Sequence, residues 1–568
     1  MALHRSCIIP LTSFKPQLAS PKAQLSKTST IKWKISEEFQ STFGNKNIYD
    51  DICVNHEEKL KVVRNTVRTV MSENYSLKGL HIVDELQRLN IDYHFQEEID
   101  SFLSREYVNV FGSNNVVGFN NNGEDLLHET SLRFRLLRQQ GHYVPAKKVF
   151  DKFIDEEENF KEELREDIKG MKDLYEASHL SIEGEDILDE AGLLSEQVLK
   201  QKAKTHLDSH GAKSLKYSLE YPFHKSLPMF TSRNFLGDYN GINGWLGSLR
   251  DVANLDFKLL QFLYQKEILQ VSKWWTGLGL ANELRFARDQ PLKWYIWSLA
   301  CLNHPSLSEE RVELTKVISF IYLLDDIFDV GGTVDKLTLF TEAVTRWDGT
   351  FSEQLPDHMK FCFKALYDLT NKISNKVYQK HGWNPIDSLH NAWKSLCKAF
   401  LVEAKWFAKG KMPKAEEYLE NALVSSGVHI VIVHVFFLLG EGITQHKVHM
   451  MDTNPPIISS SATILRLWDD LGSSEDENQE GNDGSYVHCL MMENEGILMK
   501  RAREETMRKI SEAWTRLNKE CFFECSFPKQ VKKASLNLAR MVPLMYGYDH
   551  NQSLPRLEQL VNSFFYMI

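Results

Sequence analysis

The chain has 568 residues, which is too long for one small domain and predicts about two to four domains. Its composition of 42% hydrophobic, 25% charged and 11% aromatic residues excludes collagen-like, disulfide-scaffold and wholly disordered proteins. With 67 basic and 77 acidic residues, the formal net charge is −10, so we expect no nucleic-acid partner, and any anionic ligand needs local cations or metal ions.

Residues 1–36 differ in composition from the rest of the chain. They contain no Asp or Glu, six Lys or Arg and nine Ser or Thr, without a continuous apolar run. Such a segment is typical of an organelle transit peptide, and a disordered tail is the alternative. Without this leader the chain has 61 basic and 77 acidic residues, a net charge of −16.

From residue 37 onward, apolar residues recur mostly at three- and four-residue spacing, which predicts an almost entirely α-helical protein. Only 29 Gly and 16 Pro interrupt the chain, so long helices with short connections are expected. The segment Glu57–Met71 illustrates the pattern. We expect one buried face on this helix, made of Leu60, Val62, Val63, Val67, Val70 and Met71.

Two segments rich in Gly and Asn interrupt the helical pattern, at 112–123 and at 235–247. The second predicts a domain boundary near residue 240, with one helical domain over 37–240 and another over 241–568. The most apolar stretch, at 428–440, is about half as long as a bilayer span and contains two histidines. We therefore predict a buried core helix there and no transmembrane segment.

The first candidate site follows the apolar run at 317–324. On a helix, about 100° per residue places Asp325 and Asp329 one turn apart and nearly in line, with Asp326 beside them. Neighbouring carboxylates repel each other unless cations neutralise them, and Mg²⁺ suits them because it takes oxygen ligands and bridges to phosphate. A solvated helix end is the more common explanation for a single acidic cluster.

A second candidate site lies about 140 residues later. Asp469, Ser473 and Glu477 are four residues apart and form one oxygen-bearing stripe on a helix, which suits Mg²⁺ and suits Zn²⁺ poorly. Arg466 lies on the same face, where its guanidinium suits phosphate oxygens. A salt-bridged surface helix is the alternative for this segment alone. Two such sites, each closing an apolar helix, predict opposite walls of one pocket.

These motifs resemble those of plant class I terpene synthases. The resemblance rests on DDIFD at 325–329 and DDLGSSEDE at 469–477, and it covers nearly the whole chain after the leader. It includes ASHLSIEGEDILDEA at 177–191, SKWW at 272–275, FARDQPLKWYIW at 286–297 and LTLFTEAVTRWD at 337–348. Prenyl-chain-elongating synthases share the first motif but carry DDxxD again at the second site.

The resemblance implies a monomer with two helical domains, the C-terminal one a class I terpenoid synthase helical bundle. The N-terminal domain lacks the DxDD motif of relatives that use that domain for protonation, so we expect it to have no catalytic site of its own. The resemblance also implies Mg²⁺ as cofactor, with three ions and Mn²⁺ as a substitute. The implied metal ligands are Asp325, Asp326, Asp329, Asp469, Ser473 and Glu477.

The resemblance assigns further roles around these metals. Arg288 matches the first arginine of the family's RxR element, and Arg466 the arginine before the second metal motif. Both are expected to hold the diphosphate, with Asp325, Asp329 and Asp469. The catalytic residues that the resemblance implies are Asp325, Asp329, Arg288, Arg466, Trp275 and Tyr546.

Trp275 and Tyr546 match the family's aromatic lining, which stabilises a carbocation, although ordinary core packing explains either residue equally well. The run Ser425–Gly427 matches a helix break near the diphosphate, for which a plain irregularity is an equal alternative.

Two departures from the family pattern bear on the product. Gln290 occupies the place of the second arginine of RxR, and the leader lacks the tandem arginines that precede a tryptophan in cyclising monoterpene synthases. The chain thus resembles synthases of the acyclic alcohols linalool and nerolidol. We predict ionisation of geranyl diphosphate and capture of the cation by water to give linalool, with nerolidol from farnesyl diphosphate.

Other functions remain open at this stage. The alternatives are a synthase of other acyclic or cyclic terpenes such as myrcene, ocimene or geraniol, a prenyltransferase, or an inactive helical interaction protein. The plastid supplies the shorter substrate in this family, so we expect localisation in the plastid stroma, or in the cytosol if the leader is not a transit peptide.

Overall fold

A computed structural model describes residues 46–72, 77–111, 126–205, 209–237, 245–350, 353–473, 484–494, 496–524, 527–547 and 554–566. Over these ranges the protein is helical, with no β-strand and one isolated β-bridge between Ile154 and Phe160. This confirms the all-α prediction. The predicted leader at 1–36, the loop at 112–123 and the middle of the loop at 235–247 lie outside the described residues.

The chain forms two compact units, which are described separately here. The N-terminal unit contains Thr42–Phe262 and takes in Asn518–Cys525, and the C-terminal unit contains Leu263–Leu517 and Ser526–Ile568. The division falls inside helix α12 (Trp245–Leu278). The domain assignments 1–36, 37–240 and 241–568 stay predictions.

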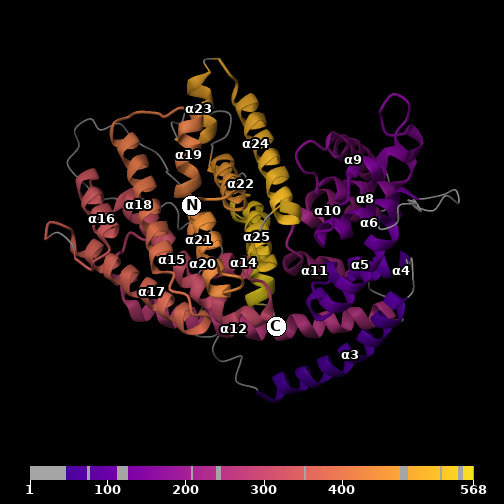
Figure 1. Ribbon diagram of the computed structural model, residues 1–568, viewed down its shortest axis with the longest axis horizontal. Helices are drawn as coiled ribbons and strands as arrows, with labels where there is room; N and C mark the ends of the chain where they lie inside the picture. Colours follow the sequence, from indigo (N-terminus) through magenta and orange to yellow (C-terminus); the bar gives the residue numbers. More distant parts are fainter. Residues whose placement is uncertain are drawn as a thin grey trace. The chain divides into compact units, whose positions relative to one another are not determined.

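In the N-terminal unit, short helices follow one another with brief connections (Figure 1). Besides the first part of α12, the α-helices of this unit are α3 (Lys46–Ser72), α4 (Leu77–Arg88), α5 (Gln96–Phe111), α6 (Leu127–Gln139), α7 (Ala146–Phe150), α8 (Ile168–Ser178), α9 (Asp186–Thr205), α10 (Ser209–Glu220) and α11 (Pro228–Gly237). The 3₁₀ turns are η1 (Asp92–His94), η2 (Asp151–Phe153), η3 (Glu162–Glu166) and η4 (Phe223–Lys225), and Glu520–Glu524 forms a π-helical turn.

Helix α3 shows how the apolar pattern decides burial. Val63, Val67 and Met71 are buried in the core of this unit, as predicted, whereas Val62 is 63% exposed. The prediction for Val62 was wrong because one residue along a helix is a rotation of about 100°, which carries its side chain off the face centred on Val63 and Val67.

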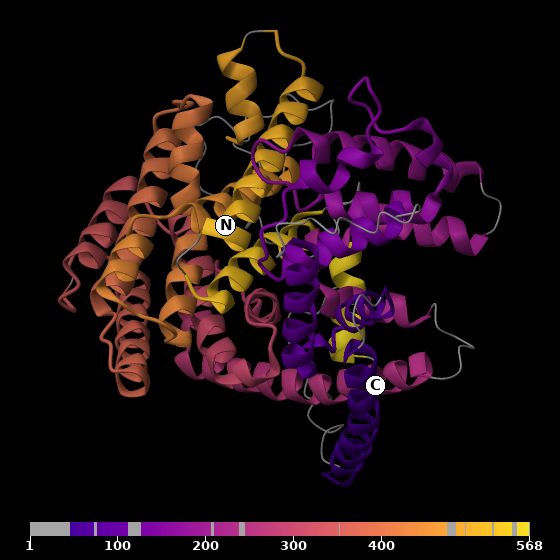
Figure 2. The same cartoon turned by 45° about the vertical axis from the view of Figure 1, so that its right-hand side comes forward.

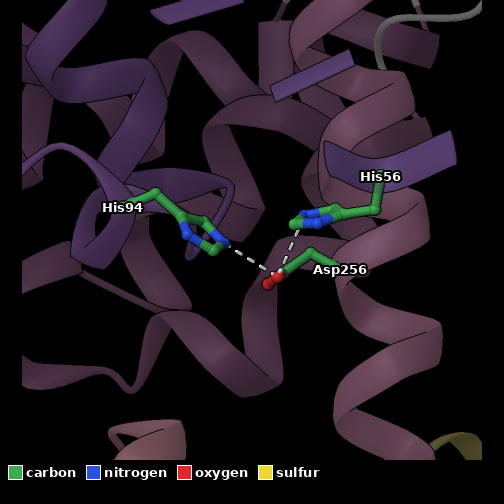
Figure 3. Close-up of side chains that lie close together, drawn as sticks. All are labelled: His56, His94 and Asp256. Atoms are coloured by element: carbon green, nitrogen blue, oxygen red, sulfur yellow. Dashed lines mark hydrogen bonds and ion pairs between the residues drawn. The ribbon is translucent and has the colours of Figure 1, made fainter. Parts of the chain in front are cut away.

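A buried carboxylate joins three elements of the N-terminal unit. Asp256 on α12 accepts a hydrogen bond from Tyr93 Oη of η1 (2.5 Å). Its Oδ1 atom also accepts from His94 Nε2 of η1 (2.9 Å) and lies 3.4 Å from His56 Nε2 of α3 (Figure 3). The three ligating atoms of the two histidines and Asp256 lie within 4.8 Å of one another. Because Oδ1 already accepts two hydrogen bonds, we interpret this cluster as a structural anchor.

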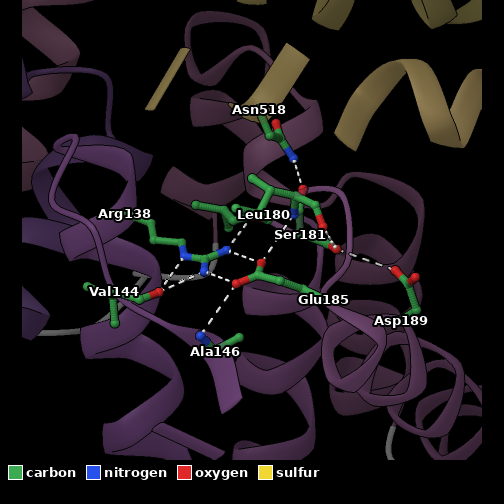
Figure 4. A network of polar contacts seen from close by, with 9 residues as sticks. Arg138, Val144, Ala146, Leu180, Ser181, Glu185, Asp189 and Asn518 are labelled. Atoms are coloured by element: carbon green, nitrogen blue, oxygen red, sulfur yellow. Dashed lines mark hydrogen bonds and ion pairs between the residues drawn. The ribbon is translucent and has the colours of Figure 1, made fainter. Parts of the chain in front are cut away.

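The segment 177–191 is held by a second polar network (Figure 4). The buried Arg138 donates to the carbonyl oxygens of Val144 (2.7 Å) and Leu180 (2.9 Å) and to both carboxylate oxygens of Glu185. Asn518 donates to the carbonyl oxygen of Ser181 (2.8 Å). These contacts give Glu185 a structural role, since its carboxylate joins α6 to the loop before α9.

The C-terminal unit is a bundle of α-helices (Figures 1 and 2). They are α13 (Leu280–Glu283), α14 (Pro291–Cys301), α15 (Ser308–Val330), α16 (Val334–Arg346), α17 (Asp357–His381), α18 (Ile386–Ala408), α19 (Ala415–Ser425), α20 (Val428–Leu439), α21 (Gln445–Asp452), α22 (Pro456–Ser473), α23 (Tyr486–Glu493), α24 (Met499–Lys519), α25 (Lys529–Tyr546) and α26 (Pro555–Val561). Pro305–Leu307 forms a 3₁₀ turn (η5), and Asn562–Tyr566 forms a π-helical turn.

The centre of this bundle consists of helices that are buried over most of their length. α14 packs against α15 and α25, α15 packs against α20, and α22 packs against α19, α20 and α25. Every residue of α14 is buried, as are all residues of α15 from Glu310 to Phe328. The first metal motif and the start of the second, Asp469 and Asp470, therefore lie on central helices of one unit.

The buried core helix predicted at 428–440 is confirmed as α20, whose residues Val428–Leu438 are all buried. Ala415–Leu439 is apolar enough to cross a membrane by length and composition alone. It contains an 18-residue window with a mean hydropathy of 2.2, but 83% of that window is buried inside the protein. The helical path also breaks at Gly427, where φ is +72°. We interpret the stretch as protein core.

Candidate active site

The first wall of the candidate site is an arginine held between two carboxylates of α15. Arg288 Nη2 donates to Asp325 Oδ2 (2.5 Å), and Arg288 Nε lies 2.7 Å from Asp326 Oδ1. The backbone N–H of Arg288 also donates to Asp326 Oδ2 (2.7 Å). Both the side chain and the backbone thus fix the 284–290 loop against the end of α15.

Burial and charge change the titration of these groups. Loss of solvation raises the pKa of Asp326 to about 6, and the neighbouring Asp325 acts in the same direction while Arg288 opposes it. Burial alone would lower the pKa of Arg288, but Asp325 and Asp326 raise it above its ordinary value. Asp326 therefore depends on nearby positive charge for its ionised form.

Asp329 differs from its two neighbours. It is the next-to-last residue of α15 and is exposed, whereas Asp325 is 1% exposed and Asp326 is buried. The exposure of the three predicted ligands thus increases from the buried Asp325 to the exposed Asp329 at the end of α15.

Asp469 forms the second wall, on α22. It is buried, and its Oδ2 atom makes no hydrogen bond. Burial raises the pKa of Asp469 to about 7, while Arg466 opposes the shift and Asp470 and Asp325 add to it. Asp325 of the first wall is thus one of the charges that act on the Asp469 carboxylate.

The adjacent Asp470 has a different task. Its carboxylate accepts from Tyr418 Oη of α19 (3.0 Å) and from the backbone N–H of Tyr486 at the start of α23 (2.9 Å). This carboxylate therefore joins three helices. Ser473 is the last residue of α22, and the predicted ligand Glu477 lies outside the described residues.

Arg466 is buried against the break between α19 and α20. Its Nη2 donates to Ser425 Oγ (2.7 Å) and lies 3.8 Å from Glu403 Oε1, and Ser425 in turn donates to Glu403 (2.5 Å). Its Nε is buried without a hydrogen bond. The predicted break at 425–427 is present, and its Ser425 accepts the hydrogen bond from Arg466, the predicted diphosphate arginine.

Trp275 and Tyr546 belong to one aromatic cluster, which includes Tyr322 of the helix that carries Asp325. Trp275 packs edge-on against Trp294 (ring centroids 4.7 Å apart), which lies 6.4 Å from Tyr322. Trp297 Nε1 donates to Tyr322 Oη (3.0 Å), and its ring lies 6.2 Å from that of Tyr546. All five rings are buried.

The sequence patterns missed three members of this cluster. Trp294, Tyr322 and Trp297 lie within segments quoted for the family resemblance or next to the first metal motif, but nothing in the spacing separated them from core residues. The signal that could have found them is position, since Tyr322 precedes Asp325 by three residues and shares its helical face.

The donor set fits divalent cations. Asp325, Asp326 and Asp469 offer carboxylate oxygens in buried positions, and Asp469 Oδ2 has no hydrogen-bond donor. The pKa values of Asp326 and Asp469 are raised by burial, so their ionised forms are stabilised most by an additional positive charge. Oxygen ligands of this kind suit Mg²⁺ or Mn²⁺.

Comparison with known families matches both units. The model of the terpene synthase family metal-binding domain matches residues 276–516, and that of the terpene synthase N-terminal domain matches residues 31–220.

Curated relatives extend over most of the chain. The chain is 53% identical over 492 residues to an (E)-nerolidol synthase from Cannabis sativa, covering 86% of this chain and 88% of the relative. It is 44% identical to the chloroplastic S-(+)-linalool synthase from Arabidopsis thaliana, covering 94% and 92%. It is also 44% identical to a chloroplastic tricyclene synthase from Antirrhinum majus, covering 94% and 93%.

Among solved structures, the chain resembles isoprene synthase from grey poplar leaves in complex with three Mg²⁺ ions and dimethylallyl-S-thiolodiphosphate. The TM-score is 0.83 at 34% sequence identity, covering 92% of this chain and 98% of the poplar chain. The predicted two-domain helical fold is confirmed by this similarity, and dependence on a divalent metal is supported.

Proposed function

We propose a reaction for this chain, which belongs to the plant terpene synthase family: it ionises geranyl diphosphate and adds water to the allylic cation, giving linalool. With farnesyl diphosphate the same chemistry gives nerolidol. The observation that carries the proposal is the pairing of Arg288 with Asp325 and Asp326, electrostatically coupled to Asp469 on another helix. This arrangement suits an anionic leaving group held by cations.

The residues around the diphosphate have distinct tasks. Asp325, Asp326 and Asp469 would hold Mg²⁺, with Asp329, Ser473 and Glu477 as further ligands expected from the sequence. When bound, Mg²⁺ stabilises the negative charge that develops on the departing diphosphate. Arg288 and Arg466 donate hydrogen bonds to phosphate oxygens and orient the leaving group.

The aromatic cluster serves the other half of the reaction. When the allylic C–O bond breaks, both electrons leave with the diphosphate and the carbon skeleton becomes a cation. The faces of Trp275, Trp294 and Tyr322 stabilise that cation without bonding to it. Water then forms a C–O bond at the tertiary carbon and releases a proton, which leaves an acyclic tertiary alcohol.

The acyclic product is supported by Gln290 at the place of the second RxR arginine and by the similarity to nerolidol and linalool synthases. The similarity to tricyclene synthases makes a cyclic product the main alternative. We further propose that the chain is a monomer and that it acts in the plastid stroma. The chloroplastic relatives support the plastid location.

The test is incubation of the purified chain lacking residues 1–36 with Mg²⁺ and each prenyl diphosphate, followed by gas chromatography of the volatiles. We expect linalool from geranyl diphosphate and nerolidol from farnesyl diphosphate. Mainly cyclic products would overturn the acyclic assignment. Consumption of added isopentenyl diphosphate would indicate a prenyltransferase, and no volatile product from any substrate would overturn the synthase activity.

A further inference from the structure

The structural anchor around Asp256 contains the ligand types of a transition-metal site. His56, His94 and Asp256 offer two imidazole nitrogens and a carboxylate oxygen, and these atoms lie within 4.8 Å of one another. The three residues come from α3, η1 and α12, and Figure 3 shows both rings directed at the carboxylate. All three belong to the N-terminal unit, so the cluster shares no residue with the candidate active site.

His56 is the member of the cluster whose position the hydrogen bonds do not explain. Its Nε2 atom is buried and makes no hydrogen bond to the described residues, although it lies 3.4 Å from Asp256 Oδ1. That oxygen already accepts from Tyr93 (2.5 Å) and His94 (2.9 Å). A buried polar atom without a hydrogen bond is costly, because it has given up its contacts with water. An ion bound between the imidazole and the carboxylate would remove this cost.

The spacing of the ligand atoms suits a tetrahedral ion. Zn²⁺ binds histidine nitrogen and carboxylate oxygen at about 2.0 to 2.2 Å, so two ligand atoms at the tetrahedral angle are about 3.3 to 3.5 Å apart. The distance of 3.4 Å between His56 Nε2 and Asp256 Oδ1 lies in this range. The distance of 2.9 Å from His94 Nε2 is shorter, because a proton lies between the two atoms. Exchange of that proton for an ion requires a shift of about half an ångström.

The surroundings of the cluster hold its ligands in place. Tyr93 Oη donates to Asp256 Oδ1, and hydrogen bonds of this kind orient metal ligands. Arg64 of α3 donates to the backbone carbonyl oxygen of His94 (3.0 Å), which fixes η1 beside α3. The side chains of His56 and Asp256 are 7% and 5% exposed, whereas that of His94 is 18% exposed. Water can therefore reach the cluster on the His94 side and complete the coordination.

The ligand types distinguish this cluster from the acidic motifs of the candidate active site. Mg²⁺ prefers oxygen ligands, whereas imidazole nitrogen favours transition metals. Two imidazoles with one carboxylate suit both Fe²⁺ and Zn²⁺, and for the same ligands Zn²⁺ binds more tightly than Fe²⁺. The cluster therefore favours Zn²⁺.

We propose that His56, His94 and Asp256 bind one Zn²⁺ ion, which joins α3, η1 and α12 of the N-terminal unit. The ion replaces the hydrogen bond between His94 and Asp256 with two metal–ligand bonds, and it gives His56 Nε2 a third. The His94 ring then carries its proton on Nδ1, so no proton is lost from the neutral imidazole. The role of the ion is structural and does not depend on the proposed terpene synthase reaction.

The test is isothermal titration calorimetry of the purified chain with Zn²⁺, after treatment with EDTA and dialysis. Excess Mg²⁺ occupies the acidic motifs, and prior alkylation of accessible thiols prevents zinc binding by cysteines. We expect one equivalent of Zn²⁺ to bind. His56→Gln and His94→Gln should each weaken this binding by about a hundredfold or more, since loss of even an outer partner of a metal ligand costs about ten- to a hundredfold.

His179→Gln is the matched control. His179 Nε2 is likewise buried without a hydrogen bond to the described residues, but its ring packs edge-on against Tyr175 (ring centroids 4.6 Å apart). Among the described residues it belongs to no group of three or more potential metal ligands. This substitution should leave the zinc affinity unchanged.

Denaturant unfolding gives a second measurement on the same chains. Because Zn²⁺ binds the folded chain, it should raise the unfolding midpoint of the unsubstituted chain and of His179→Gln, and leave that of His56→Gln unchanged. Absence of zinc binding by the unsubstituted chain would overturn the proposal, as would equal affinity in the folded His56→Gln variant. Neither measurement needs turnover, so the outcome is independent of any terpene product.

Discussion

At the scale of single residues, neighbouring acids in the same motif have different tasks. Asp469 keeps one carboxylate oxygen without a hydrogen bond, whereas the adjacent Asp470 is occupied by Tyr418 and Tyr486. Among the first acids, Asp325 and Asp326 share Arg288 while Asp329 is exposed. Side-chain direction and burial, rather than residue type, decide which carboxylate can bind a metal ion.

Replacing Asp325 with Asn should abolish turnover while leaving the fold intact. The amide has nearly the same shape but lacks the charge that holds Arg288 and a metal ion. We expect kcat/KM to fall by about a thousandfold or more, measured by release of terpene product. Asp357→Asn is the control, because Asp357 is 99% exposed on the same unit. Retention of more than about a tenth of the activity would contradict the role of Asp325.

Asp256 should stabilise the N-terminal unit in a pH-dependent way. Burial alone would raise the pKa of Asp256, but the polar contacts with His56, His94 and Tyr93 lower it below the ordinary value of 3.8. A depressed folded-state pKa contributes stability above the unfolded value, and this contribution is lost as the pH falls through the folded value. Asp256→Asn should therefore cost about 1.5 to 3 kcal/mol at pH 7.

Denaturant unfolding of the two chains at pH 7 and at pH 5 to 3 tests this prediction. The difference in unfolding free energy should be constant above about pH 5 and should shrink below about pH 4. Asp251→Asn on the same helix is the control, since Asp251 is 43% exposed, and its pairing with Lys59 contributes about 0 to 1 kcal/mol. Equal effects of the two substitutions would show that the Asp256 anchor adds nothing.

At the scale of helices, the break between α19 and α20 contacts two helices of the site: α15, which carries Asp325, and α22, which carries Arg466. Gly427 lies so close to α15 that a Cβ atom would be 2.7 Å from Ile321 Cγ2. Two residues earlier, Ser425 accepts a hydrogen bond from Arg466 of α22. The break therefore sets the position of the diphosphate arginine relative to the helix that carries Asp325.

Gly427→Ala should be more harmful than an equivalent change elsewhere. Gly382 has the same φ of +72°, but a Cβ atom there would have no neighbour within 4 Å. Gly382→Ala should cost about 1 to 2 kcal/mol through backbone strain alone. Gly427→Ala should cost about 1 to 3 kcal/mol more because of the close contact with Ile321. Denaturant unfolding measures both costs, and equal losses would exclude a specific role for the close approach.

Turnover provides a second measurement on the same pair. Gly427→Ala should reduce kcat/KM because it displaces Ser425 and with it Arg466, whereas Gly382→Ala should leave the kinetics of the folded chain unchanged. Normal kinetics in a folded Gly427→Ala variant would indicate that the break is only a packing irregularity.

At the scale of the whole molecule, the net charge of −16 after residue 36 and the anionic substrate are compatible. Five of the acidic residues, Asp325, Asp326, Asp329, Asp469 and Glu477, are proposed to recruit divalent cations rather than to repel the ligand. Arg288 and Arg466 are proposed to add positive charge beside these acids. Local charge, and not the total, determines what the site attracts.

Residues 1–36 should act as a targeting signal and should not contribute to catalysis. Deleting them should leave kcat/KM within about twofold, because every candidate site residue lies between Trp275 and Tyr546. Fusing 1–36 to a fluorescent protein should direct it to plastids. Diffuse cytosolic fluorescence would contradict the transit peptide and would favour farnesyl diphosphate as the substrate.

The sequence by itself determined the helical class, the family and the helices that carry the two metal motifs. The helical class follows from local spacing, because three- and four-residue periodicity fixes which residues share a helical face. The family follows from the resemblance of the motifs to those of plant class I terpene synthases. The error at Val62 shows the limit of this argument even within one helix.

Only the tertiary structure decided which distant residues meet. Helix packing decides the pairing of Arg288 with both Asp325 and Asp326, and the contact of Arg466 with Ser425. It also gathers the aromatic rings contributed by α12, α14, α15 and α25. The raised pKa of Asp469 depends on burial and on charges from other parts of the chain. Packing and desolvation are properties of the assembled bundle, and no spacing along the chain encodes them directly.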